Sequence, residues 1–194
     1  NTGTVQIGDL VKDSQRYEKY RELGFGQKTG VELPGESSGI MPNWEDWDGR
    51  QRYTTMFGQG VAATLLQVSS GMATVANGGV RVAPHLIDSW TKPGGTVEKK
   101  QVKQGTRVYS QETARELLTM MEGVVSENGG AKNAQIEGYR VAGKTGTTQI
   151  LAPNGTQLGA DGSFSGIFPA NNPRVVITVV VHRPRVSIFG SVVA

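Results

Sequence analysis

The sequence predicts an α+β fold in which helices come first and an antiparallel sheet, flanked by helices, comes last. Apolar residues recur at helical spacing over 61–76 and again over 114–125, which is the pattern of amphipathic helices. Three strand-like segments follow, at about 138–150, 163–168 and 174–182. Helices and strands in separate stretches of a chain are typical of this class. With 194 residues, 37% of them hydrophobic, the chain is long enough for one domain with a core.

The first part of the chain is predicted to hold two short helices and a long loop. Residues 2–12 form the first predicted helix, and Ser14 is placed to cap a second that runs to about Leu23 and ends at Gly24. Serine accepts hydrogen bonds from the free N–H groups of a helix start, and glycine tolerates the left-handed conformation of a helix end. Residues 25–55 contain many turn-forming residues, so they are predicted to be mainly loop.

Two longer helices and a set of short strands are predicted next. One helix starts at Val61 and ends at the glycine pair 78–79. Another is capped by Ser110 and ends at the glycine pair 129–130. The segment 80–108 between them is predicted to form short strands, because prolines and glycines interrupt it.

The last strand is predicted to be central in the sheet. Residues 175–181 are apolar at every position except Thr178. A strand with helices on both faces needs apolar side chains at consecutive positions. We therefore expect helices to cover both faces of this segment.

Composition argues against several partners and kinds of chemistry. The formal net charge is +3, without a dense basic tract, so nucleic-acid binding is not expected. No cysteine is present, which excludes disulfides and thiol chemistry. No apolar run approaches the ~20 residues of a membrane helix, and no signal peptide is recognisable. No metal and no cofactor are predicted.

The most informative motif is Lys144-Thr145-Gly146-Thr147, on the first of the three final strands. A lysine ammonium is fixed there, and Gly146 has no side chain, so a peptide-like ligand can approach the backbone closely. Thr147 and Thr148 offer hydroxyls to a carboxylate. A Lys-Thr-Gly strand is one of three signatures of serine acyl-transferases that react with penicillin.

Other literal matches to these signatures are predicted to be structural. Lys28-Thr29-Gly30 lies between a helix end and a Pro-Gly turn, as a connecting hairpin would. The only Ser-x-x-Lys runs from Ser89 to Lys92 and is followed by Pro-Gly-Gly, which cannot continue the helix that would bring the serine and lysine together. The Ser-x-Asn match at Ser126 lies at a helix end before two glycines, as a C-terminal cap would.

These motifs and their surroundings resemble the C-terminal part of the transpeptidase domain of class B penicillin-binding proteins, the division-type enzymes that cross-link peptidoglycan. The resemblance covers nearly all of residues 1–194, and actinobacterial members are the most similar. The segments that carry it are Asn1-Thr2-Gly3-Thr4-Val5, Phe25-Gly26 through Leu33-Pro34-Gly35-Glu36, Phe57-Gly58-Gln59-Gly60, Ala76-Asn77-Gly78-Gly79-Val80, Tyr139 through Thr148, and Phe168-Pro169-Ala170-Asn171-Asn172-Pro173-Arg174.

The resemblance implies a penicillin-binding, serine β-lactamase-like transpeptidase fold, of which residues 1–194 are the C-terminal portion. The family's nucleophilic Ser-x-x-Lys segment is then expected outside this chain, so that the chain alone is not a competent enzyme. Asn1 is expected to be the asparagine of the Ser-x-Asn signature, with an amide that binds the substrate and the active lysine. As an alternative or additional role, asparagine at this position caps a helix.

The resemblance also implies a role for each site residue. Lys144 is expected to relay protons and to stabilise charge, and Thr147 to orient the substrate carboxylate. The strand edge at Thr145 and the backbone N–H of Thr147 are expected to contact the substrate, the latter as half of an oxyanion hole. Ile188 stands where relatives often have tyrosine, which weakens the expectation of an aromatic wall there. Further residues expected to bind substrate are Gly146, Thr148, Phe57, Gln59 and Phe189.

The function implied is D,D-transpeptidation through an acyl-serine intermediate, inhibited by β-lactams. Three alternatives share the fold: a penicillin-recognising sensor or inactive binding module, a D,D-carboxypeptidase and a β-lactamase. The implied partners are the D-alanyl-D-alanine stem peptide, β-lactams, other cell-division proteins, and the missing N-terminal part as a separate chain. The implied location is the outer side of the cytoplasmic membrane, with an anchor outside this chain.

Overall fold

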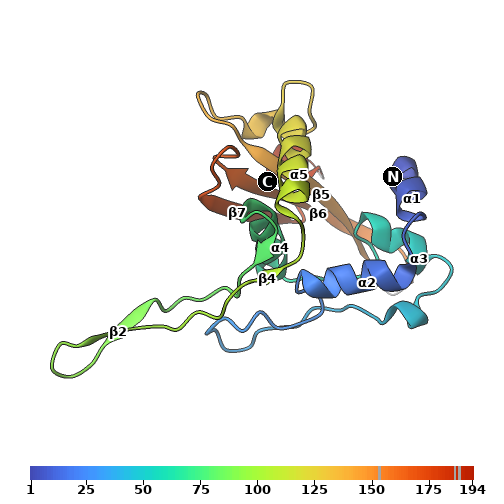
Figure 1. The fold of residues 1–194 in the computed structure, drawn as a ribbon. Helices are drawn as coiled ribbons and strands as arrows, with labels where there is room; N and C mark the ends of the chain where they lie inside the picture. The colour runs from blue at the N-terminus through green and yellow to red at the C-terminus, as the bar shows by residue number, and fades with distance from the viewer. Residues whose placement is uncertain (153, 186, 188) are drawn as a thin grey trace. The chain divides into compact units, whose positions relative to one another are not determined.

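The computed structural model describes residues 1–152, 154–185, 187 and 189–194. The chain divides into two compact units. The first unit comprises Asn1–Ser70 and Arg81–Val108, and the second comprises Gly71–Val80 and Tyr109–Ala194. Helices precede a three-stranded antiparallel sheet in chain order, which confirms the predicted α+β class (Figure 1).

The first unit begins with two helices, α1 (Thr2–Gly8) and α2 (Asp13–Glu22). The predicted cap at Ser14 is wrong by two residues, because α2 starts at Asp13 with Lys12 as its N-cap. The side chain of Gln15 reaches back and accepts a hydrogen bond from the Lys12 N–H at 3.3 Å, and an acidic residue in the first turn suits the helix dipole. The end of α2 is as predicted, with Gly24 in a left-handed conformation at φ 97°.

The loop-rich segment after α2 contains three short helical pieces: η1 (Trp44–Asp46), α3 (Gln51–Thr54) and η2 (Thr55–Phe57). The next helix, α4 (Leu65–Ala76), starts four residues later than predicted. Ala62 exchanges backbone hydrogen bonds of 2.8 Å with Ile40, so residues before Leu65 are extended. Thr64 and Gln67 then close the helix start, each accepting a hydrogen bond from the other's backbone N–H, a capping box.

Short strands occupy the segment 80–108, as predicted. β1 (Val80–Arg81) pairs with β4 (Thr106–Arg107). β2 (Ser89–Thr91) and β3 (Val97–Lys99) form an antiparallel hairpin that extends from its own unit (Figure 1).

The second unit is built on the sheet β5–β6–β7 and the helix α5 (Gln111–Val125). The strands are β5 (Ala142–Leu151), β6 (Gln157–Phe168) and β7 (Val175–His182). α5 starts as predicted, because the Ser110 hydroxyl accepts the Thr113 N–H at 3.0 Å. A short η3 (Lys132–Ala134) precedes the sheet and a short α6 (Gly190–Val193) follows it.

The core of this unit lies between α5 and one face of the sheet (Figure 1). Ala142 of β5 and Ile167 of β6 are completely buried there and lie opposite each other in the strand register. They pack with Met72, Val75 and Ala76 of α4 and with Leu117, Leu118 and Met121 of α5.

The prediction that the last strand is central is wrong. The strand order is β5–β6–β7, so the central strand is β6. β7 has one face toward the core at Val176, but Val175, Ile177 and Val179 on its other face are 46%, 56% and 40% exposed. An apolar run alone does not show whether a strand is covered on both faces or, as β7 is here, on only one.

Candidate active site

The strand that carries Lys144 lies at an edge of the sheet. β5 pairs with β6 from Ala142, opposite Ile167, to Leu151, opposite Gln157. Over the described ranges it has no second strand partner. An edge strand presents unpaired backbone N–H and C=O groups, which can bind an extended peptide as an additional strand. Lys144 is exposed on this strand.

Neighbouring side chains of β5 project to opposite faces of the sheet. Ala142 lies in the core beneath α5, and alternation places Lys144 and Thr148 on that same face. Thr145 and Thr147 project to the other face. The Thr147 and Thr148 hydroxyls, both expected to meet one carboxylate, therefore point in different directions. Lys144 Nζ donates a hydrogen bond of 2.7 Å to the carbonyl oxygen of Thr145.

The Thr147 face of β5 is in contact with the last helix. The backbone N–H of Gly190, the first residue of α6, donates to Thr147 Oγ1 at 3.3 Å. Phe189 immediately precedes this contact and is 59% exposed. The structure therefore brings the predicted substrate residues Thr147 and Phe189 to one region. Ile188 lies outside the described residues.

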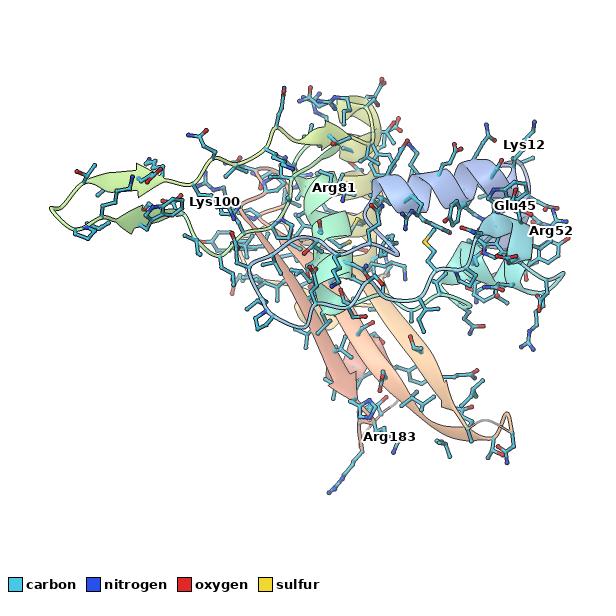
Figure 2. The ribbon with its side chains drawn as sticks, turned by 90° about the horizontal axis from the view of Figure 1, so that it is seen from below. Lys12, Glu45, Arg52, Arg81, Lys100 and Arg183 are labelled. Atoms are coloured by element: carbon cyan, nitrogen blue, oxygen red, sulfur yellow. The ribbon has the colours of Figure 1, made fainter. Side chains whose placement is uncertain are left out.

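A polar contact between Asp161 and His182 fixes the far end of the sheet. Asp161 on β6 lies opposite Thr148 on β5 and opposite His182 on β7. Its Oδ1 is 2.7 Å from His182 Nδ1 and accepts the Arg183 backbone N–H at 3.2 Å. Arg183, which has a positive φ of 47°, follows the end of β7 (Figure 2). Asp161 thus holds the turn by which the chain leaves the sheet.

The second Lys-Thr-Gly, at residues 28–30, is a closed loop and not a strand. The carboxylate of Glu36 accepts hydrogen bonds from the Thr29 N–H at 2.7 Å, the Thr29 hydroxyl at 2.6 Å and the Gly30 N–H at 3.1 Å. The Thr29 hydroxyl bond is the main cause that lowers the pKa of Glu36, with further lowering from the two N–H groups and Lys28. This copy is therefore a loop closed by Glu36 and not the connecting hairpin that the sequence predicts.

The two other literal matches are structural as well. Ser89 lies on β2, and Lys92 follows this strand and pairs with Glu98 at 2.6 Å. Three residues along an extended strand place side chains on opposite faces, so Ser89 and Lys92 do not form a nucleophile–base pair. Ser126 is the C-cap of α5, and its hydroxyl donates to the Gly123 carbonyl oxygen at 2.8 Å.

The remaining predicted site residues, Asn1, Phe57 and Gln59, belong to the first unit, whereas Lys144 to Thr148 belong to the second. Asn1 is the N-cap residue of α1, but its side chain makes no capping hydrogen bond. Its amide is therefore available for another partner. Phe57 is half-buried at the end of η2, and Gln59 is exposed.

A pocket of about 550 Å³ lies beside the residues that lead into β5. The Arg140 guanidinium forms two hydrogen bonds with the Glu122 carboxylate there, at 2.6 and 2.7 Å. These bonds raise the pKa of Arg140. The pocket is lined by Glu122, Val125, Ser126, Gln135, Ile136, Glu137, Tyr139, Arg140 and Val141, so it does not include the Lys144 strand edge.

In the part of the chain that the structure describes, no three His, Asp or Glu side chains approach one another closely enough to hold a metal ion. None of the described helices has the length and apolar character of a membrane span.

Comparison with known protein families identifies the family of this chain. The model of the penicillin-binding protein transpeptidase domain matches residues 1–194. The chain belongs to this transpeptidase family. Class B proteins are among its relatives, and this chain corresponds to a C-terminal part of their transpeptidase domain.

Two curated relatives illustrate how much of a class B transpeptidase this chain represents. Penicillin-binding protein PbpB of Mycolicibacterium smegmatis is 41% identical over 200 residues, which cover 98% of this chain and 31% of the relative. Peptidoglycan D,D-transpeptidase FtsI of Escherichia coli is 30% identical over 186 residues, which cover 95% of this chain and 30% of the relative. The chain therefore spans less than a third of the curated relatives' length.

Solved structures agree with the fold. Penicillin-binding protein 3 from Mycobacterium tuberculosis, complexed with aztreonam, superposes with a TM-score of 0.90 at 36% identity. The match covers 94% of this chain and 43% of that one. The same protein has also been solved complexed with ampicillin, with the same TM-score. The predicted transpeptidase fold is thus confirmed.

Proposed function

We propose that the whole protein cross-links peptidoglycan by D,D-transpeptidation, and that the free edge of β5 is its substrate groove. The observation that carries this proposal is the Lys144-Thr145-Gly146-Thr147 motif on an exposed edge strand of a transpeptidase-family chain. A stem peptide that ends in D-alanyl-D-alanine would lie antiparallel to β5, as an added strand.

The chemistry proceeds in two acyl transfers. A serine hydroxyl attacks the carbonyl carbon of the penultimate D-alanine, the peptide bond breaks, and the terminal D-alanine leaves with the proton on its amine. An amine of a second stem peptide then attacks the acyl-serine ester, which forms the cross-link and restores the serine hydroxyl. Lys144 supplies positive charge and a proton path. The Thr147 N–H stabilises the oxyanion, and the Thr147 hydroxyl binds the terminal carboxylate.

The nucleophilic serine is proposed to come from a part of the protein outside residues 1–194. Ser89 and Ser126 occupy a hairpin and a helix cap, so neither is placed for this role. Asn1, whose amide is not used for capping, is proposed as the asparagine of the Ser-x-Asn signature. Phe57, Gln59 and Phe189 are proposed to bind substrate.

The ligands and location follow from the same proposal. β-Lactams would acylate the serine as covalent mimics of the stem peptide, which is consistent with the aztreonam and ampicillin complexes of the mycobacterial relative. The natural substrate is met outside the cytoplasmic membrane, so the groove would face that side. Other cell-division proteins and the nucleophile-bearing segment are the proposed protein partners.

Mass spectrometry of the whole protein tests this proposal. After incubation with benzylpenicillin, one covalent adduct is expected on a serine outside residues 1–194. Adding a D-amino acid together with a thioester analogue of the stem peptide should then give acyl transfer to the amine, which separates a transpeptidase from a sensor. An adduct on Ser89, or acylation without any transfer or hydrolysis of the analogue, would contradict the proposed function.

A further inference from the structure

We infer that Gly190 is a positioning residue for substrate recognition, which acts through the hydroxyl of Thr147. The inference rests on the proposed function, because it concerns how the Thr147 hydroxyl is presented to the substrate carboxylate. Gly190 belongs to a different element from the Lys-Thr-Gly strand, 43 residues further along the chain.

The hydrogen bond from Gly190 determines which way the Thr147 hydroxyl can donate. A threonine hydroxyl has one hydrogen to donate and two lone pairs that accept. The Gly190 N–H donates to Thr147 Oγ1 at 3.3 Å, so it occupies one lone pair and the hydroxyl hydrogen turns away from α6. The hydroxyl is thereby prepared as a donor, which is the role that a carboxylate ligand requires.

Space explains why this position is glycine. Gly190 is buried, and a Cβ there would collide with the carbonyl oxygens of Gly146 and Ser163. These are backbone atoms of β5 and β6, which cannot rotate away as a flexible side chain would. Its φ is not in the left-handed range, so close approach, and not backbone conformation, requires the missing side chain. α6 can therefore lie directly against the backbone of the Lys-Thr-Gly strand.

The small residues of the sheet form the matching surface. A Cβ at Gly162, which lies opposite Thr147, would come within 3.1 Å of the Gly190 Cα and 2.5 Å of Val193 Cγ2. The first turn of α6 thus packs on a patch made by Gly146, Gly162 and Ser163. A side chain at position 190 would push α6 and β5 apart and withdraw the N–H from Thr147.

Acylation kinetics of the whole protein test the inference with benzylpenicillin and its methyl ester as probes. Gly190→Ala should slow acylation by benzylpenicillin at least about tenfold, the scale of one charge-assisted hydrogen bond. The ester, which has no carboxylate charge, should change less than about threefold. In a Thr147→Val background Gly190→Ala should no longer alter the preference for the carboxylate, because the two substitutions remove the same contact.

Two more variants separate positioning from packing. Gly166→Ala is a matched control, since its Cβ would crowd the Phe164 ring at 3.0 Å without touching Thr147 or α6. It should slow both probes equally if it slows either. Ser187→Ala adds no bulk and removes the hydroxyl that accepts the Phe189 N–H at 3.2 Å, which loosens the approach to Gly190. It should reduce the ratio of the acylation rates of benzylpenicillin and its methyl ester, which is the carboxylate preference, about two- to fivefold. This variant tests the inference even if Gly190→Ala fails to fold.

The outcomes are distinguishable. Equal loss for acid and ester in Gly190→Ala, or an unchanged preference in Ser187→Ala, would overturn the inference while leaving the proposed function intact. If the unmodified protein is not acylated by benzylpenicillin at all, the proposed function fails and the inference with it.

Discussion

Replacing Lys144 and Lys28 in turn tests which of the two Lys-Thr-Gly copies belongs to the active site, because the two lysines have different environments. Lys144 is exposed on the free edge of β5, and the proposed function requires its charge to meet both the nucleophile and the substrate carboxylate. Lys28 is exposed in a loop that Glu36 closes through Thr29 and Gly30. Only the first environment offers a peptide-binding edge.

The expected loss for Lys144→Ala is large. Two unit charges 4 Å apart interact by about 4 kcal/mol at an effective dielectric constant near 20, and part of this is screened because Lys144 is exposed. Removing a general acid–base group or an electrostatic partner typically slows a reaction by about 10²- to 10⁴-fold. We therefore predict that Lys144→Ala slows acylation of the whole protein by at least about 10²-fold. Lys28→Ala should change the rate less than about twofold, the range of ordinary surface substitutions.

The assay is the second-order rate constant of acylation by a fluorescent penicillin, with melting temperatures measured for each variant. Lys144→Arg provides a further control, because it keeps the charge but is too basic to relay a proton. It should recover part of the loss and not all of it. Equal effects of Lys144→Ala and Lys28→Ala at unchanged melting temperature would refute the assignment of the site to β5.

Two other predictions concern stability. Ile167→Ala should destabilise the protein by about 2–5 kcal/mol in denaturant titrations, because Ile167 is completely buried between the sheet and α5; a loss below about 1 kcal/mol would contradict this core. Glu36 has a lowered pKa in the fold, so its stabilisation of the 28–36 loop is present above the unfolded glutamate pKa of about 4.3 and is lost as pH falls through the lower folded value. The hydrogen-exchange protection of the Thr29 and Gly30 amides, relative to their intrinsic rates at each pH, should therefore fall below about pH 4, and Glu36→Gln should abolish that pH dependence of protection.

Local patterns predicted the helices well where the chain itself carries the determinant. Ser110 caps α5 through its own hydroxyl, and Gly24 ends α2 with a positive φ. The start of α4 was misplaced because a distant residue, Ile40, holds Ala62 in extended conformation. Such a tertiary contact leaves no trace in the apolar spacing from Val61 onward.

The order of strands could not be predicted from hydrophobicity. The residues of β7 look more buried in sequence than those of β6, which contains three glycines and two serines between Gly159 and Gly166. β6 is nevertheless central, because its small residues let strands and helices approach closely on both sides. The outer face of β7 is exposed at Ile177 and Val179.

The candidate site was predictable only where its determinants are local in the sequence. The spacing of Lys144, Gly146 and Thr147 within one strand is local, so the motif could be recognised from the sequence. The contact of Gly190 with Thr147 joins residues 43 positions apart, and a glycine after Phe189 resembles any helix start. Only the packing of α6 on the β5 backbone distinguishes it.

The most direct test of the central claim, that the β5 edge is the acyl-transfer groove, is a crystal structure of the whole protein acylated by benzylpenicillin. The penicillin side-chain amide should pair with the β5 backbone, and its carboxylate should lie within about 3.2 Å of Thr147 Oγ1, in the range of a hydrogen bond. A covalent adduct seated away from β5, at the β2–β3 hairpin or at the loop around Lys28, would contradict the account.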